Sequence, residues 1–286
     1  MKSSKGSRQA LSYCAAEVRR HDHDRFLATL FAPKACRESL FALYAFNYEL
    51  AKTREVVSEP MIGDIRLQWW RERIAELFAG NVTEHAVLRA LASTHAATPL
   101  SRAYFETLIE ARALDLDDTP FSTLSDLRAY AEATNAPLFY LALEAVGSPR
   151  EPALLAAKSA GAAYGLIGLL RAIPFHAKQR RSFLPRDVAA EAGINEGHLF
   201  TGKVPKGLPQ AVGIIAQRAA ALLVEARSRQ GELNAGERAA LYPLIPATLS
   251  LHTLRRCGYD AFNARFQMSH PARLLALTWH HWRGRL

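Results

Sequence analysis

The chain has 286 residues, 49% of them hydrophobic, and its 36 lysines and arginines exceed its 27 aspartates and glutamates to give a formal net charge of +9. No run of about 18 apolar residues occurs, so the sequence predicts no transmembrane span. The three cysteines Cys14, Cys36 and Cys257 lack the spacing of a disulfide framework or a zinc site. These features predict a cytoplasmic protein with one domain, residues 21–286, behind a short basic N-terminus, residues 1–20, that frays.

Helical periodicity dominates the rest of the chain. Apolar residues recur three and four positions apart, and no alternation of period two appears. Turn-forming residues interrupt the pattern, for example at Gly80-Asn81 and Ile173-Pro174, and Thr123 with Asp126 forms a capping box. The sequence therefore predicts an all-α bundle. Its periodic segments are 26–31, 40–50, 62–78, 108–114, 124–146, 154–173, 212–226 and 241–254.

One helical face in segment 43–55, LYAFNYELAKTRE, is poor in acidic side chains. Positions 47, 51 and 55 are four residues apart and share this face. The segment resembles the first helix of squalene and phytoene synthases, A-x-Y-A-x-C-R-x-x-D-D-x-x-D, whose aspartates hold Mg²⁺ against prenyl diphosphates. On that pattern Ala51 and Lys52 occupy the positions of the leading aspartates, and Glu55 is the acidic residue that remains.

A second segment resembles the other metal motif of that family. Residues 164–176, YGLIGLLRAIPFH, followed by RRSFLP, are similar to Q-L-x-N-I-L-R-D-V-x-x-D and R-x-Y-L-P. Arg171 matches, but Gly168 takes the asparagine position, and Ala172 and His176 take the two aspartate positions. Because Mg²⁺ requires hard oxygen ligands, we expect no metal site and no cofactor.

The resemblance runs from about residue 21 to the C-terminus. It implies an isoprenoid-synthase-type helical bundle around a central cavity, with helix 37–57 facing helix 154–173. Segments 45–51, 57–70 and 170–176 are similar to the branch of the mitochondrial respiratory complex I assembly factor of squalene/phytoene synthase type, which implies a pseudoenzyme. The alternative is an active head-to-head prenyltransferase, a squalene or phytoene synthase that condenses two farnesyl or geranylgeranyl diphosphates and would need Mg²⁺.

The two motif helices and the loop behind them supply candidate binding residues. The old substrate cavity could hold an isoprenoid or another lipid, and a cluster of cations could bind a diphosphate, because guanidinium groups bind phosphate oxygens bidentately. A solvated basic loop is the alternative for this cluster. The candidates are Tyr44, Asn47, Tyr48 and Tyr164 as cavity lining, and Arg171, Lys178, Arg180 and Arg181 for the anion.

Two acidic stretches allow more than one interpretation. Asp115, Asp117 and Asp118 precede Thr119-Pro120, which favours a turn, although the family carries an acidic residue followed by leucine near this place. In His21-Asp22-His23-Asp24 the spacing of two points the side chains apart on a helix, so we expect the rim of the cavity and not a metal site.

The C-terminal segment is basic and aromatic. No carboxylate follows Asp260, while Trp279, Trp282, Arg283 and Arg285 lie close together, and segment 171–186 is also free of acids. We expect these two segments to contact an anionic membrane surface, peripherally on the inner membrane, or a respiratory-complex subunit. Solvated faces are the alternative. No nucleic-acid motif accompanies them, and we expect the pair Trp69-Trp70 in the core.

Overall fold

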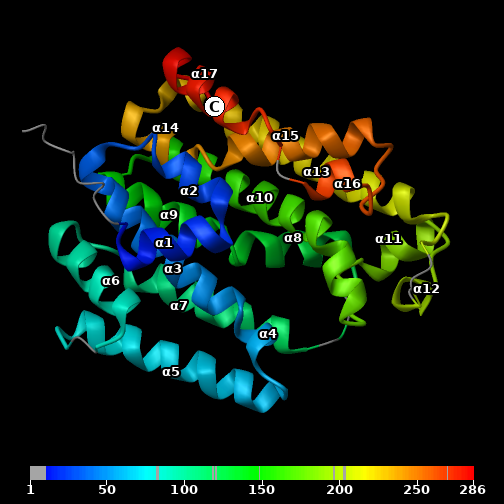
Figure 1. Ribbon diagram of the computed structural model, residues 1–286, viewed down its shortest axis with the longest axis horizontal. Coiled ribbons are helices and arrows are strands. Elements are labelled where there is room, and N and C mark those ends of the chain that lie inside the picture. Colours follow the sequence, from blue (N-terminus) through cyan, green and yellow to red (C-terminus); the bar gives the residue numbers. More distant parts are fainter. Residues whose placement is uncertain are drawn as a thin grey trace, which may run out of the picture.

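A computed structural model describes residues 11–286 except 82, 83, 118, 120, 148, 196, 202, 203 and 269. Every regular element within these residues is a helix, and they contain no β-strand (Figure 1). The predicted all-α fold is therefore confirmed.

The helices follow one another with short connections. In the first half they are α1 (Tyr13–His21), α2 (His23–Thr29), η1 (Lys34–Cys36), α3 (Arg37–Ala51), α4 (Thr53–Val56), α5 (Pro60–Phe78), α6 (Ala86–Ala97), α7 (Arg102–Ala111), η2 (Arg112–Leu116), α8 (Leu124–Ala133) and α9 (Ala136–Val146). In the second half they are α10 (Glu151–Lys178), α11 (Arg186–Glu191), α12 (Gly197–Phe200), α13 (Leu208–Ser228), η3 (Gln230–Glu232), α14 (Ala235–Leu241), α15 (Leu244–Arg256), α16 (Ala264–Gln267) and α17 (Arg273–Arg283).

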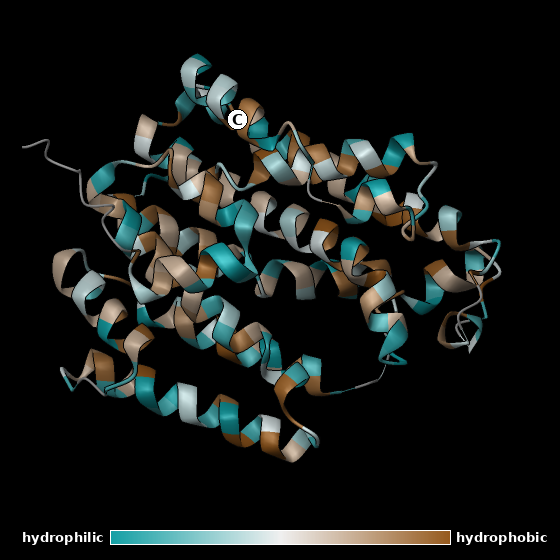
Figure 2. Ribbon diagram, in the orientation of Figure 1, coloured by the Kyte–Doolittle hydropathy of each residue, from teal (hydrophilic) through white to brown (hydrophobic). Residues whose placement is uncertain are grey.

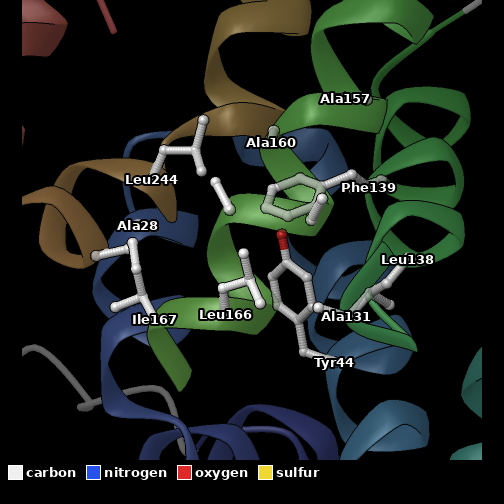
Figure 3. Packing of buried hydrophobic residues seen from close by; sticks show 14 of the residues in the cluster. Ala28, Tyr44, Ala131, Leu138, Phe139, Ala157, Ala160, Leu166, Ile167 and Leu244 are labelled. Carbon is white, nitrogen blue, oxygen red and sulfur yellow. The ribbon is translucent and has the colours of Figure 1, made fainter. Parts of the chain in front are cut away.

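Helix α10 is the centre of the bundle and packs against α8, α9 and α13. Small residues allow this close approach: a Cβ on Gly161 would lie 2.4 Å from the backbone of Ala136 in α9. Figure 3 shows Ala157, Ala160 and Leu166 of α10 in the core beside Phe139. In Figure 2 the central helices are mostly brown, whereas α5 at the lower edge alternates between teal and brown.

Helix α10 is also long and apolar enough to cross a membrane, which the absence of an 18-residue apolar run did not predict. However, 67% of its most apolar window is buried inside the protein. Packing against the surrounding helices accounts for this apolarity, because a core helix is hydrophobic on all sides.

Several predicted boundaries are wrong. The segment 13–20, predicted to fray, belongs to helix α1, whose first turn is capped by the Ser12 side chain. The predicted helix 37–57 ends at Ala51, and the segment 124–146 divides at Thr134-Asn135 into α8 and α9. Helix α10 continues through Pro174 instead of ending before it. The capping box of Thr123 and Asp126 is confirmed.

Candidate functional site

A cavity of about 240 Å³ opens between the C-terminal part of α10 and the elements α3, α4, η2 and α8. Ala51 of α3 and Ala172 of α10 both line it, so the predicted pairing of these two helices across a central cavity is confirmed. The lining residues are Arg25, Asn47, Ala51, Arg54, Glu55, Arg112, Asp115, Tyr130, Thr134, Asn135, Tyr164, Gly165, Gly168, Leu169, Ala172, Phe175, His176, Gln179, Arg181 and Phe183.

The structure brings together five of the six positions that resemble the metal motifs. Ala51, Glu55, Gly168, Ala172 and His176 line the cavity. The sixth position is Lys52, which does not line it. Its Nζ lies 2.5 Å from Oε1 of the buried Glu49, and the other carboxylate oxygen of Glu49 accepts a hydrogen bond of 2.8 Å from Arg66.

The described lining residues fit a magnesium ion poorly. Their only carboxylates are Glu55 and Asp115, and the part of the chain that the structure describes holds no group of three or more histidines, cysteines or acids placed to share a metal. Burial, and then the charge of Asp115, raises the pKa of Glu55. Mg²⁺ prefers a near-octahedral shell of oxygen atoms, and one free carboxylate with raised pKa does not provide it.

Asp115 is held by protein groups. Its carboxylate accepts a hydrogen bond of 3.1 Å from Nη1 of Arg112 and another from the hydroxyl of Tyr130, while its backbone carbonyl accepts one of 2.6 Å from Arg181. Burial, and then the nearby carboxylate, raises the pKa of Tyr130, so the hydroxyl remains a donor. This pairing compensates a charge that is 7% exposed.

The turn preferred for the acidic stretch is thus wrong for Asp115, which lies in η2 and faces the cavity. It holds for Asp117, whose carboxylate accepts a hydrogen bond of 2.8 Å from the backbone N–H of Thr119. Asp118 lies outside the described residues. The position of Asp115 thus agrees better with the alternative, the acidic residue followed by leucine that the family carries near this place.

His176 lies on the cavity side of α10, close to the ring of Phe183 at 4.5 Å between centroids. Burial, and then the charge of Arg181, lowers the pKa of His176 to about 4. Its ring is therefore neutral at pH 7, and its buried Nδ1 has no hydrogen-bond partner among the described residues. A neutral imidazole here offers one donor and one acceptor to a small polar ligand.

The four cations predicted to bind an anion are not brought together. Arg171 leaves the cavity and pairs with Asp24 at 3.3 Å, and Asp24 also binds Arg273 of α17 at 2.9 Å. Lys178 and Arg180 are exposed and do not line the cavity, so only Arg181 faces it. The cause is helical geometry, because residues 171 and 178 lie on a different side of α10 from residues 172 and 176.

Other arginines take this place, and little in the sequence indicated them. Arg25 is 3% exposed, binds Asp22 at 3.1 Å and lies over the ring of Tyr164 at 4.4 Å. Arg54 and Arg112 line the cavity as well. The one available signal was the stretch His21 to Asp24, expected at the rim, since Asp22 both caps α2 and holds Arg25.

The four expected lining residues separate into two pairs. Asn47 and Tyr164 line the cavity, as predicted. Tyr44 is buried in the core beside Leu166 and Ala131 and does not reach the cavity surface (Figure 3). The ring of Tyr48 stacks on that of His21 at 4.1 Å, away from the cavity.

Residues 18–273 match the family model described as squalene/phytoene synthase. The chain belongs to this family. Among curated relatives, NADH dehydrogenase (ubiquinone) complex I, assembly factor 6 of Rattus norvegicus is 32% identical over 96% of this chain and 82% of its own length. The human assembly factor 6 is 30% identical, over 95% of this chain and 81% of its own length.

Synthases of the same family are more distant. Phytoene synthase 1 of Arabidopsis thaliana is 25% identical over 94% of this chain and 65% of its own length. A crystal structure of a dehydrosqualene synthase superposes with a TM-score of 0.81 at 21% identity, covering 93% of both chains. A squalene synthase from Alicyclobacillus acidocaldarius gives 0.76 at 24% identity, covering 87% of this chain and 94% of its own. These likenesses confirm the isoprenoid-synthase type of fold.

In this member of the squalene/phytoene synthase family the aromatic pairs differ in burial. Trp70 is 1% exposed, as predicted for the core, but its neighbour Trp69 is 38% exposed. On α17, Trp279 and Trp282 are 51% and 76% exposed. Arg283 and Arg285 are exposed beside them, with the guanidinium of Arg283 4.3 Å from the ring centroid of Trp279.

Proposed function

We propose that this chain is a non-catalytic member of the squalene/phytoene synthase family that acts in the assembly of a respiratory NADH dehydrogenase. Its similarity to assembly factor 6 extends over nearly the whole chain, at higher identity than its similarity to the phytoene synthases. Both groups share the fold, so the fold alone favours neither role. The side chains that line the cavity favour the non-catalytic role over prenyl transfer.

The observation that carries the proposal is the composition of the cavity wall at the motif positions. Ionisation of an allylic diphosphate requires metal ions to stabilise the charge on the leaving group. Ala51, Gly168 and Ala172 offer no ligand atoms there, and the neutral His176 offers a single nitrogen. The remaining acids are Glu55, with its raised pKa, and Asp115, bound by Arg112 and Tyr130. We therefore expect no metal cofactor and no prenyl transfer.

The proposed partner is a subunit of the respiratory complex, and the proposed location is the surface of the membrane that carries this complex. An isoprenoid in the cavity finds less support. The volume of about 240 Å³ is below the roughly 300–1,000 Å³ of common ligand sites. Charged side chains, four of them arginines, also line it. Binding of a prenyl chain would require the walls to separate.

The assembly role can be tested in the source organism by deleting the gene and measuring the amount of assembled, active NADH dehydrogenase. We expect the amount to fall, and we expect both the wild-type chain and the Glu55→Gln variant to restore it. Among the described lining residues, Glu55→Gln removes the carboxylate that no protein group holds, and it keeps the shape of the side chain. Unchanged NADH dehydrogenase after deletion would contradict the assembly role. Failure of a folded Glu55→Gln protein to restore it would contradict the non-catalytic role.

A further inference from the structure

Helix α17 has an apolar outer face at the surface of the protein. Leu274, Leu275, Trp279 and Trp282 are 49%, 73%, 51% and 76% exposed, and we call them the α17 face. Positions 275, 279 and 282 are four and three residues apart, so these three side chains stand above one another on one side of the helix. Figure 1 shows α17 at the upper edge of the molecule, outside α15. These three side chains form an exposed apolar row, with Leu274 beside it, and water solvates such a patch poorly.

The opposite side of α17 fixes the helix to the bundle. Leu277 is fully buried. The ring of His281 lies 5.5 Å from that of Phe31, which follows α2, and its Nδ1 lies 3.2 Å from the hydroxyl of Tyr242. Gly284 ends the helix in a left-handed conformation with a φ of 60°, a cap that glycine adopts without strain. At the other end Arg273 binds Asp24. The α17 face is therefore presented by an anchored helix.

The charged side chains of α17 and of the segment around it after Asp260 are all arginines. No acidic residue follows Asp260, whereas Arg265, Arg283 and Arg285 are exposed. Arg283 lies against the ring of Trp279, which leaves its charge beside the apolar face. An apolar row that includes tryptophan and is bordered by arginine is the composition of helices that lie in the plane of a membrane interface.

A second exposed apolar row, on α5, differs from the α17 face in the charges around it. On α5, Met61, Ile65 and Trp69 are 65%, 63% and 38% exposed at spacings of four. That helix, however, has three acids, Asp64, Glu72 and Glu76, against three arginines, Arg66, Arg71 and Arg73. Two of these arginines are paired, Arg66 with Glu49 and Arg73 with Glu76, each at 2.8 Å. The α5 row has no excess of positive charge to attract an anionic surface.

We propose that the α17 face docks onto the surface of an anionic lipid bilayer, with its leucines and tryptophans in the interface and Arg283 and Arg285 at the headgroups. This attachment does not depend on the proposed assembly role, because it uses no residue of the cavity. It concerns one of the two basic segments expected from the sequence to contact a membrane. In segment 171–186, Arg171 is paired with Asp24 and Arg181 faces the cavity. Lys178, Arg180 and Arg186 of that segment are exposed, but Phe175 is its one exposed large apolar side chain, so it presents no apolar row.

The test is flotation of the full-length chain with vesicles of phosphatidylcholine alone or mixed with phosphatidylglycerol, at low and high salt. We expect binding to the mixed vesicles that falls with added salt, since exposed charges are screened. The double variant Leu275→Glu, Trp282→Glu should lower the partition coefficient at least about tenfold, and Arg285→Gln about fivefold. The matched control, Met61→Glu with Ile65→Glu, adds the same two carboxylates to α5 and should bind like wild type.

Three results would overturn the proposal. One is equal binding to neutral vesicles, and another is a loss of binding in the α5 control as large as in the α17 variant. The third is no binding by the wild-type chain. If that chain is also a dimer in size-exclusion chromatography and Leu275→Glu, Trp282→Glu makes it monomeric, the α17 face contacts a second copy instead. Circular dichroism verifies that both double variants are folded, which their exposed positions favour.

Discussion

The cavity has two walls of opposite character. The wall formed by α3 and α10 presents small side chains, Ala51, Gly168 and Ala172, at the positions that resemble the metal motifs. The wall formed by η2 and α8 retains charge, but Asp115 is bound by Arg112 and Tyr130. Ala51, Gly168 and Ala172 offer no side-chain ligand atoms on one wall, and the carboxylate of Asp115 on the other wall is used within the protein. Charge in a cavity is thus no sign of metal binding when the protein itself compensates it.

Removal of the Asp115 carboxylate from the charged wall should have the largest effect on stability. Asp115→Ala leaves Arg112, whose side chain is 14% exposed, without its carboxylate, and the Tyr130 hydroxyl without its acceptor. We expect the free energy of unfolding to fall by about 3–5 kcal/mol, as for other buried pairs that lose one member. Urea denaturation monitored by circular dichroism measures it. Asp117→Asn, at an exposed site, is the control and should leave the midpoint unchanged. A loss below about 1 kcal/mol for Asp115→Ala would mean that this wall is not held by the pair.

Acid should lower the free energy of unfolding through His176 of α10, which lines the cavity. Its pKa is about 4 in the folded state, below the 6.5 of the free side chain. The unfolded state therefore binds a proton first as the pH falls, and the folded state loses stability between about pH 6.5 and 4. The loss is up to about 3 kcal/mol. Unfolding curves at pH 7 and pH 4.5 measure it. His176→Gln should lose less over the same interval, and an equal loss in both proteins would contradict the assignment.

Two glycines of α10, Gly165 and Gly168, lie one turn apart and differ in the space beside them. A Cβ on Gly165 would lie 2.7 Å from the carbonyl oxygen of Ala131, whereas a Cβ on Gly168 would meet nothing within 4 Å. We expect Gly165→Ala to lower stability by about 1–3 kcal/mol through overpacking. Gly168→Ala should raise it by about 0.5–1 kcal/mol, because alanine favours the helix. Thermal unfolding of the two variants measures both changes. Stability changes of the same sign would contradict the difference in space beside the two glycines.

The sequence predicted those parts of the site that depend on local periodicity. Within each motif the spacing predicted one shared face, for Ala51 with Glu55 and for Gly168, Ala172 and His176. That the two motifs face one cavity was implied by the family resemblance. Asp115 was assigned to a turn because the residues after it are typical turn formers. Its partner Arg112 lies three residues earlier in η2, but its other partner, Tyr130, lies on α8. Contacts between distant segments, such as Arg25 with Asn135 at 3.4 Å, leave no trace in a single sequence.

Boundaries failed for physical reasons as well. Pro174 was expected to end a helix, yet α10 continues for another turn, where packing outweighs one missing backbone hydrogen bond. The break between α8 and α9 has no glycine before it, and its signals are those of a helix start, Asn135 at the N-cap and Pro137 in the first turn of α9. Segment 13–20 was predicted to fray for its charge, but Cys14, Ala15 and Val18 bury one face of α1 in the core.

The central claim is that the cavity performs no metal-dependent prenyl transfer. The most direct measurement is pyrophosphate release by the purified full-length chain with Mg²⁺ and farnesyl or geranylgeranyl diphosphate. A no-enzyme reaction and the Glu55→Gln variant serve as controls. The account predicts release equal to the no-enzyme control for both proteins. Release by the wild-type chain above this control, abolished by Glu55→Gln, would contradict it and would identify Glu55 as part of a working metal site.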